Sequence, residues 1–567
     1  MTDGRTGGWL LGGRVDVCSA AVLLAAMLSP SAHPPIRRSA DPPTRRSADP
    51  PTRRSADPPL RPSVQYPPGE RVLITDFSSI TALAASPLYV FAATAHGLTI
   101  YNRQSSEWQL PVTILDGYPR APVRAAVADV MGNAVWLGTD AGWARYDADL
   151  HRWDGAAIPG GVRSLLLDAA DPASGIYLQT STEWVFLPRG GVVPFSTAGR
   201  PLPPPGRRIT PLGLEQALNT ATAGDAFRAF ILTDSRLRSY TFTAAARSPD
   251  QREIFFGTNG AGLIRIDPAT AAWEALPFGL GARGAGAVVV GKTGVWAASF
   301  TLPLDSRPQS DITLLSPDLT RATLYSGRTY GSDCRQSRGI ALDGTAVWVA
   351  CDAGVLRVDS RDRRARLFPL ESVLAIAASR RGLWVGTPHG LRLIDSTDHV
   401  SSLGNLAEPI YSLALLHDTL WVGTARGLAF LPNDGSDLYA RTAVPGPEPP
   451  PALGAPVLLV ARIGEALAVA TTDQFVWRDA AGTRWTVLRP PAEVGDVTDI
   501  AGLEGSAWIA GTGGVAFCDL AHSSFETLTV PRDLPAPVRG VAVDSQYVWM
   551  ATDSGVVRLA RHTIFGP

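Results

Sequence analysis

The sequence is poor in lysine, histidine and cysteine, and these shortages limit the functions that it supports. Lys292 is the only lysine, so the basic residues are almost all arginine, which we attribute to codon usage rather than to a binding role. The formal net charge of -1 gives the chain no overall attraction to nucleic acid or to anionic membranes. The histidines are scattered, and no H-E-x-x-H, G-x-S-x-G or C-x-x-C motif occurs. Zinc protease, serine hydrolase and zinc-ribbon functions therefore have no support, and we expect no cofactor, no bound metal and no catalytic residue.

The apolar run near the N-terminus, at residues 17–28, is too short for a membrane span. It follows Arg5 and Arg14 and precedes small residues, which is the layout of a secretory signal peptide. We predict a signal peptide over residues 1–32 and an extracytoplasmic location, either periplasmic or secreted. The alternative is a start codon assigned too far upstream. Contact with a membrane is expected only through an uncleaved leader.

Residues 33–69 follow as a segment rich in proline and arginine. It contains the octapeptides PPIRRSAD, PPTRRSAD and PPTRRSAD. Proline pairs favour polyproline II, and the segment has no apolar residues that could form a core. We predict a solvated, disordered linker, and the aspartate in each repeat argues against a nucleic-acid partner.

The rest of the chain repeats one pattern, seen most clearly at residues 383–395, LWVGTPHGLRLID, and again at 420–431, LWVGTARGLAFL. Each copy combines an apolar run, turn residues and an alternating run, which predicts a strand, a tight turn and a second strand. A lone hairpin is marginal in water, so the copies must pack together. Aligned on Trp384, they fall at Phe91, Trp136, Tyr177, Phe255, Trp296, Trp348, Trp384, Trp421, Ala468, Trp508 and Trp549.

Further strands are predicted on both sides of the hairpin. A strand of small apolar residues precedes many copies, for example at 373–377, and a polar strand that often holds an aromatic residue follows, as at Trp153. Four strands and a spacing of about 40–50 residues are typical of one propeller blade. Small residues suit the crowded inner strand of such a blade, and bulky residues suit its rim.

These residues resemble the two-component regulator propeller repeat family, whose pattern is a strand followed by W-x-G-T-x-x-G-L-x-x-x-D. The copies at 135–147, 254–267, 347–359 and 383–395 carry the resemblance, which covers about 70–567. It implies an all-β protein of β-propellers that forms the sensor portion of a two-component receptor. The Gly-Thr pair is incomplete at Tyr177, Trp296, Trp348 and Ala468, where we expect less regular blades.

Eleven or twelve blades exceed the four to eight of one ring, so we predict two consecutive β-propellers. The N-terminal propeller is assigned to 70–334, with an insertion at about 197–241 in which residues 212–231 have helical spacing. A six-bladed C-terminal propeller is assigned to 335–567. Residues 72–75 are expected to supply a missing outer strand to one of the rings.

The predicted function is a non-enzymatic binding or sensing module for a protein, a glycan or a small molecule, acting alone or with a signalling partner. One alternative is a propeller enzyme, such as a streptogramin-lyase-like or glycan-cleaving lyase, which requires histidine and acidic residues clustered at a ring mouth. The other alternative is an assembly scaffold without a small-molecule pocket.

The predicted functional face carries the turns of the repeated hairpin and the links between blades, because the longest loops fall there. These loops are 301–311, 326–337 and 441–456, together with the insertion. The candidate ligand-binding residues at the hairpin turns are Asp140, Asn259, Asp352, His389, Arg426 and Asp553.

Cys334 and Cys351 precede and end neighbouring antiparallel strands of one blade, which would place them at the same end of that blade. In an oxidising compartment they would form a disulfide, and two buried free thiols are the alternative. Cys518 is expected to remain a free thiol.

Overall fold

The description below concerns the compact unit Ser63–Pro567, which is separate from residues 1–62. The predicted signal peptide, nearly all of the linker and most of the three long loops lie outside the residues that the structure describes. In the described part, no helix is long and apolar enough to span a membrane. The computed structural model describes residues 66–129, 133–197, 201–220, 239–270, 272–301, 311–326, 334–403, 406–433, 453, 456–503 and 505–565.

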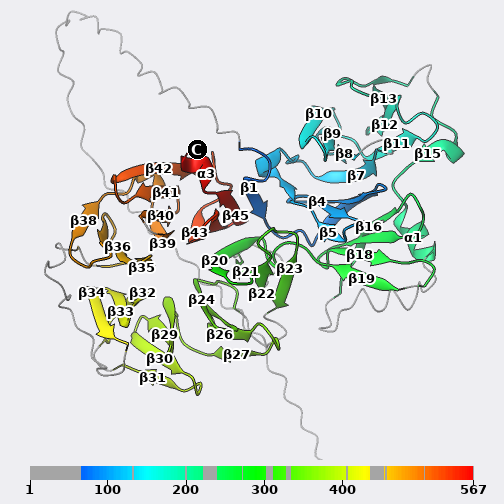
Figure 1. The fold of residues 1–567 in the computed structure, drawn as a ribbon. Helices are drawn as coiled ribbons and strands as arrows, with labels where there is room; N and C mark the ends of the chain where they lie inside the picture. Colours follow the sequence, from blue (N-terminus) through cyan, green and yellow to red (C-terminus); the bar gives the residue numbers. More distant parts are fainter. Residues whose placement is uncertain are drawn as a thin grey trace, which may run out of the picture. The chain divides into compact units, whose positions relative to one another are not determined.

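The fold is all-β, and the described strands form eleven antiparallel sheets, most of them with four strands (Figure 1). This confirms the predicted β-propeller architecture. In the blade built on the repeat, β28 (Ala375–Ser379), β29 (Gly382–Thr387), β30 (Gly390–Asp395) and β31 (Val400–Ser402) lie side by side in chain order. The repeated hairpin therefore joins the second and third strands of a blade. Trp384 is fully buried and faces Ala377 on β28 and Leu393 on β30.

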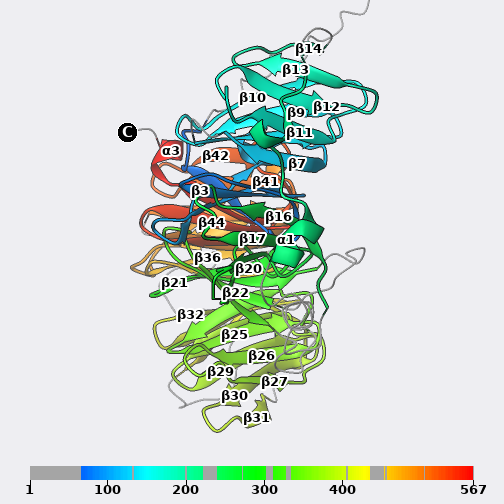
Figure 2. The same ribbon diagram turned by 90° about the vertical axis from the view of Figure 1, so that its right-hand side faces the viewer.

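Four of the sheets form a row that we call the N-terminal ring. The first strands of these sheets contact one another in the order β16, β2, β7 and β11. The predicted insertion follows β14, and its described part includes β15, which pairs with β11, and helix α1 (Leu214–Thr220), which packs on β16 (Figure 2). The strands of this ring are β2 Ile80–Ala85, β3 Tyr89–Thr94, β4 Gly97–Asn102, β5 Glu107–Trp108, β6 Val112–Thr113, β7 Val123–Ala128, β8 Ala134–Thr139, β9 Gly142–Asp147, β10 Arg152–Ala157, β11 Ser164–Asp168, β12 Gly175–Gln179, β13 Trp184–Pro188, β14 Phe195–Ser196, β15 Arg208–Ile209, β16 Phe242–Arg247, β17 Ile254–Thr258, β18 Leu263–Ile266 and β19 Trp273–Leu276.

The C-terminal ring has seven blades. Its remaining strands are β1 Arg71–Ile74, β20 Gly284–Gly291, β21 Gly294–Phe300, β22 Asp311–Leu315, β23 Ala322–Ser326, β24 Gly339–Asp343, β25 Ala346–Cys351, β26 Gly354–Asp359, β27 Ala365–Phe368, β32 Ile410–Leu416, β33 Thr419–Thr424, β34 Gly427–Pro432, β35 Leu459–Ile463, β36 Ala466–Ala470, β37 Phe475–Arg478, β38 Trp485–Leu488, β39 Val497–Leu503, β40 Ser506–Gly511, β41 Gly514–Asp519, β42 Ser524–Thr529, β43 Val538–Val543, β44 Tyr547–Thr552 and β45 Gly555–Ala560.

Contacts between the first strands close this ring in the order β20, β24, β28, β32, β35, β39, β43 and back to β20. The sheet of β20–β23 therefore completes the C-terminal ring, whereas the sequence had assigned its residues to the N-terminal propeller. The boundary falls between β19 and β20 instead of at 334/335, and the predicted six blades become seven. The blade repeat could not reveal this, because each blade looks alike whichever ring it joins.

Strand β1 supplies the outer strand of the last blade by pairing with β45, with Leu73 opposite Val557. The C-terminal ring is thus closed by a strand that precedes the whole N-terminal ring in sequence. The chain leaves this ring at Thr75 and returns beside it, where the Leu280 N–H donates to the Thr75 carbonyl at 2.8 Å. The N-terminal ring is therefore an insertion into the C-terminal one.

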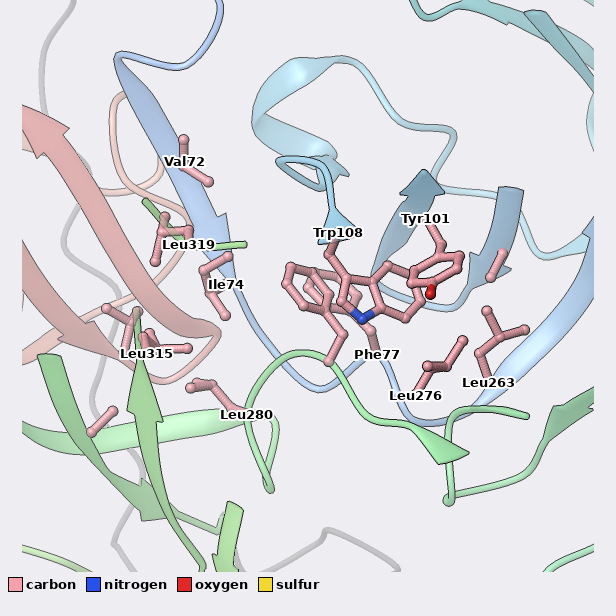
Figure 3. Close-up of a cluster of buried hydrophobic side chains, with 14 of the residues drawn as sticks. Val72, Ile74, Phe77, Tyr101, Trp108, Leu263, Leu276, Leu280, Leu315 and Leu319 are labelled. Atoms are coloured by element: carbon pink, nitrogen blue, oxygen red, sulfur yellow. The ribbon is translucent and has the colours of Figure 1, made fainter. Parts of the chain in front are cut away.

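An aromatic cluster packs the junction between the rings (Figure 3). Phe278 stacks on Phe77 with ring centroids 5.9 Å apart, and on Trp108 at 4.9 Å. Ile74 and Leu280 belong to the same buried cluster. The two connections are thus packed together, which fixes them to each other.

Candidate functional site

The repeated hairpin turns are closed by their threonines. The Thr387 Oγ1 donates to the Gly390 carbonyl at 2.9 Å and accepts from the His389 N–H at 3.2 Å. Asp395 similarly accepts from the N–H groups of Thr397 and His399 at the next turn of the same blade. These residues satisfy turn backbone groups, which accounts for their recurrence. The same contact to the carbonyl at the end of the turn is made by Thr94, Thr139, Thr258, Thr424 and Thr552.

The structure divides the six candidate residues between the two rings. Asp140 and Asn259 lie on the N-terminal ring, and the other four lie on the C-terminal ring. Asp140 forms a two-point ion pair with Arg124, at 2.7 and 2.5 Å, which lowers the pKa of this exposed carboxyl. The Asn259 Oδ1 lies 3.1 Å from the Ser79 hydroxyl. The six residues therefore do not form one site.

Two of the candidates are joined on the C-terminal ring by a series of side-chain and backbone contacts. Asp553 pairs with Arg539 at the start of β43, and the Arg539 guanidinium lies 3.6 Å from the centre of the Phe300 ring. Phe300 forms a β-bridge with Gln336, and the Gln336 N–H donates to Asp352 at 3.3 Å. We call these five residues, which span three neighbouring blades, the mouth arc.

A disulfide bond adjoins the mouth arc. Cys334 and Cys351, which lie two residues before Gln336 and one residue before Asp352 in the sequence, form a disulfide. It links the segment that enters β24 to the hairpin turn of the same blade. The Asp352 carboxylate also accepts from the Arg335 N–H at 3.0 Å. The disulfide and these backbone contacts hold the Asp352 carboxylate in place.

The other two candidates lie on the next blades around the ring. His389 is exposed at the turn of the β29–β30 hairpin. Arg426 is strongly exposed and lies 3.4 Å from Glu408. The opposite face carries His417 with Glu465 and His522 with Asp519. In the described part, no group of His, Cys, Asp and Glu is arranged to hold a metal ion.

Sequence reasoning missed Asp499, which lies on the inner strand β39. Its Oδ2 accepts from the Val541 N–H of the next blade at 2.8 Å, and its Oδ1 accepts from the Ile500 N–H at 2.9 Å. Burial raises the pKa of this carboxyl to about 6. The sequence offered only one weak signal, a carboxylate in a strand that otherwise resembles an inner strand.

The described part also contains a cavity of about 780 Å³ between the two rings. Its walls include the tyrosines 66, 89 and 146 and the guanidinium groups of Arg71 and Arg532. Arg71 already donates to the Asp533 carbonyl at 2.9 Å and packs on Tyr66. The cavity is therefore a polar cleft. Its Arg71 guanidinium is already used in contacts that hold the fold together.

Comparisons with known proteins show similarity to solved structures alone. No protein-family model matches the chain, and no curated protein matches it. One similar structure is PorZ, a surface component of the type-IX secretion system of Porphyromonas gingivalis, with 14% identity, 88% of each chain covered and a TM-score of 0.49. Virginiamycin B lyase of Staphylococcus aureus covers 49% of this chain and 94% of its own, with 13% identity and a TM-score of 0.40. The extracellular domain of a putative one-component system of B. thetaiotaomicron has 12% identity and a TM-score of 0.33, with 88% of this chain and 71% of that chain covered.

Proposed function

We propose that this chain is a non-enzymatic, extracytoplasmic sensing module that binds a protein or small-molecule ligand at the mouth arc of its C-terminal ring. The observation that carries the proposal is the series of contacts from Asp553 through Arg539 to Phe300, which continues to Asp352 through the backbone of Gln336. A carboxylate, a guanidinium and an aromatic ring on one rigid edge can recognise a ligand through charge, hydrogen bonds and stacking.

Two further features support the proposal. The mouth arc lies on the face of hairpin turns and blade links, which is also the face on which the long loops 301–311, 326–337 and 441–456 begin and end. The disulfide at Cys334 is typical of proteins in oxidising compartments, which agrees with export. Membership of the two-component regulator propeller family, and with it a signalling partner, remains part of this proposal.

The test uses the full chain and a partner or ligand captured from the exported fraction. The double variant Arg539→Ala/Asp553→Ala should weaken binding at least tenfold while the far-UV circular dichroism stays unchanged. The matched control is Asp343→Ala/Lys292→Ala, which alters one acid and one base at the turns between the first and second strands, on the opposite face. Equal loss in both double variants, or loss in the control alone, would place binding elsewhere.

Shortening the loops 301–311 and 441–456 provides a second test of the same face. Binding should weaken while the thermal transition persists. Cell fractionation tests export separately, and retention of the unprocessed chain in the cytosol would contradict it.

A further inference from the structure

The cavity between the two rings, which we call the inter-ring cavity, has an apolar floor and a polar rim. Its volume of about 780 Å³ falls within the range of about 300–1,000 Å³ that is usual for small-molecule sites. An apolar surface with a few polar groups around it is also usual for such sites. The buried lining residues include Val72, Ile100, Pro111, Val112 and Tyr146, and the exposed ones are Pro68, Gln109, Asp116, His151 and Arg532.

The Arg532 guanidinium on this rim keeps its hydrogen-bonding capacity unused. Its one ion pair within the described residues is with Asp533, whose Oδ1 lies 3.7 Å from the Arg532 Nε. That distance is too long for a hydrogen bond. The other carboxylate oxygen of Asp533 accepts from the N–H and the hydroxyl of Thr529, at 2.9 and 3.2 Å. The two terminal nitrogens of Arg532 therefore have no hydrogen-bond acceptor in the described part of the chain.

Three other side chains of the cavity have unused hydrogen-bonding groups. The Tyr146 hydroxyl lies 3.1 Å from the Nδ1 of His151, which leaves the His151 Nε2 without a partner among the described residues. The side-chain amide of Gln109 and the hydroxyl of Tyr89 likewise have no hydrogen bond within the described ranges. An imidazole, an amide and a phenol can each donate, and a guanidinium can only donate. The cavity therefore suits a ligand that carries hydrogen-bond acceptors.

The single acid that lines the cavity, Asp116, already has partners. Its Oδ2 accepts from the Thr113 N–H at 2.9 Å and from the Thr113 hydroxyl at 3.1 Å. The positive charge of Arg71 also acts on this carboxylate, and the Arg71 guanidinium donates to the neighbouring Leu115 carbonyl at 3.4 Å. Asp116 and Arg71 thus balance each other, and Arg532 is the cation that remains for a ligand.

We propose that the inter-ring cavity binds an organic carboxylate with an apolar body, such as an arylalkanoate, through Arg532. The carboxylate accepts two parallel N–H···O bonds from the guanidinium, and the apolar body lies on the floor formed by Val72, Ile100 and Val112. A neutral ligand would forgo the charge-assisted bonds, and a cation would be repelled by Arg532. The cavity shares no residue with the mouth arc, so this site goes beyond the proposed function.

The test measures binding of 3-phenylpropionate to the full chain by isothermal titration calorimetry. 3-Phenylpropanamide keeps the ring without the charge, and acetate keeps the charge without the ring. We expect saturable binding of 3-phenylpropionate, with a Kd at least about tenfold below that of either comparison compound.

Variants at two arginines locate the site. Arg532→Ala should weaken binding of 3-phenylpropionate at least about tenfold, and Arg532→Lys should weaken it less, because lysine keeps the charge but not the two-point contact. The matched control is Arg489→Ala, at an exposed position in the equivalent link one blade earlier, and it should bind like the wild type. Because both arginines are exposed, the far-UV circular dichroism of all three variants should match that of the wild type.

N-acetyl-L-phenylalanine separates two sources of the same chemistry, a free acid and the carboxyl terminus of a peptide. Binding at least as tight as that of 3-phenylpropionate indicates a peptide terminus, and weaker binding indicates a free acid.

No binding of 3-phenylpropionate, or equal affinity for 3-phenylpropionate, its amide and acetate, would overturn the inference. Equal affinities of Arg532→Ala and Arg489→Ala would overturn it as well. The proposed function has a separate readout in the mouth-arc double variant. If partner binding depends on Arg539 and Asp553 while 3-phenylpropionate does not bind, the carboxylate site alone is wrong.

Discussion

Replacement of Asp499 by asparagine should stabilise the protein at neutral pH. The carboxyl has an ordinary pKa of 3.8 and a pKa of about 6 in the folded chain. Between these values the native state binds more protons than the unfolded state, so the contribution of this group to the free energy of unfolding falls as pH rises. A difference of roughly 2 pKa units corresponds to about 3 kcal/mol.

Asparagine removes that cost and retains an oxygen that can accept from the Val541 N–H. Its amide N–H groups would lack partners in the wild-type surroundings, which costs some free energy. We therefore expect Asp499→Asn to raise the free energy of unfolding by about 2 kcal/mol above pH 7. Below about pH 4 the wild type is protonated in both states, so the two proteins should differ little.

The assay is urea-induced unfolding of the wild type and the variant at intervals between about pH 4 and pH 8. The difference in unfolding free energy should increase with pH and level off above about pH 7. Asp343→Asn is the control, because its carboxylate lies in an exposed turn on the opposite face. Stability curves of the wild type and Asp499→Asn that run parallel over the whole range would refute the reasoning.

Three further predictions concern the fold. Thr387→Val removes both side-chain hydrogen bonds of its turn and should cost about 1–2 kcal/mol in chemical unfolding, whereas Thr419→Val, with no comparable contact, should cost much less. Cys334→Ser opens a disulfide that spans 17 residues and should cost about 3 kcal/mol, and thiol labelling of the exported wild type without residues 1–32, unfolded and non-reduced, should modify Cys518 alone. A chain that lacks β1 should become protease-sensitive in the blade of β43–β45, and if it resisted cleavage like a chain starting at residue 63, ring closure by β1 would not matter for stability.

The sequence by itself determined the unit of the fold. The repeated hairpin has apolar residues for two strands, glycine and threonine for its turn, and an aspartate for the next turn, and all of these act within a few residues of one another. Local chemistry of this kind can be read directly, which is why the blades, the buried Trp384 and the helix at α1 could be predicted. The disulfide between Cys334 and Cys351 could also be anticipated, because the pairing of two neighbouring antiparallel strands places both cysteines at the same end of one blade.

The tertiary structure decided how the blades close into rings. The sheet of β20–β23 joined the C-terminal ring, and β1 closed that ring across the entire N-terminal one, because strand pairing between distant segments depends on packing that no local pattern records. The candidate site changed for the same reason. Asp140 lies on a different ring from Asp553, while Phe300 and Arg539 are in contact although they belong to separate blades. Asp499 gained its raised pKa only because seven strands converge around it, and neither the convergence nor the missing counter-ion is visible along the chain.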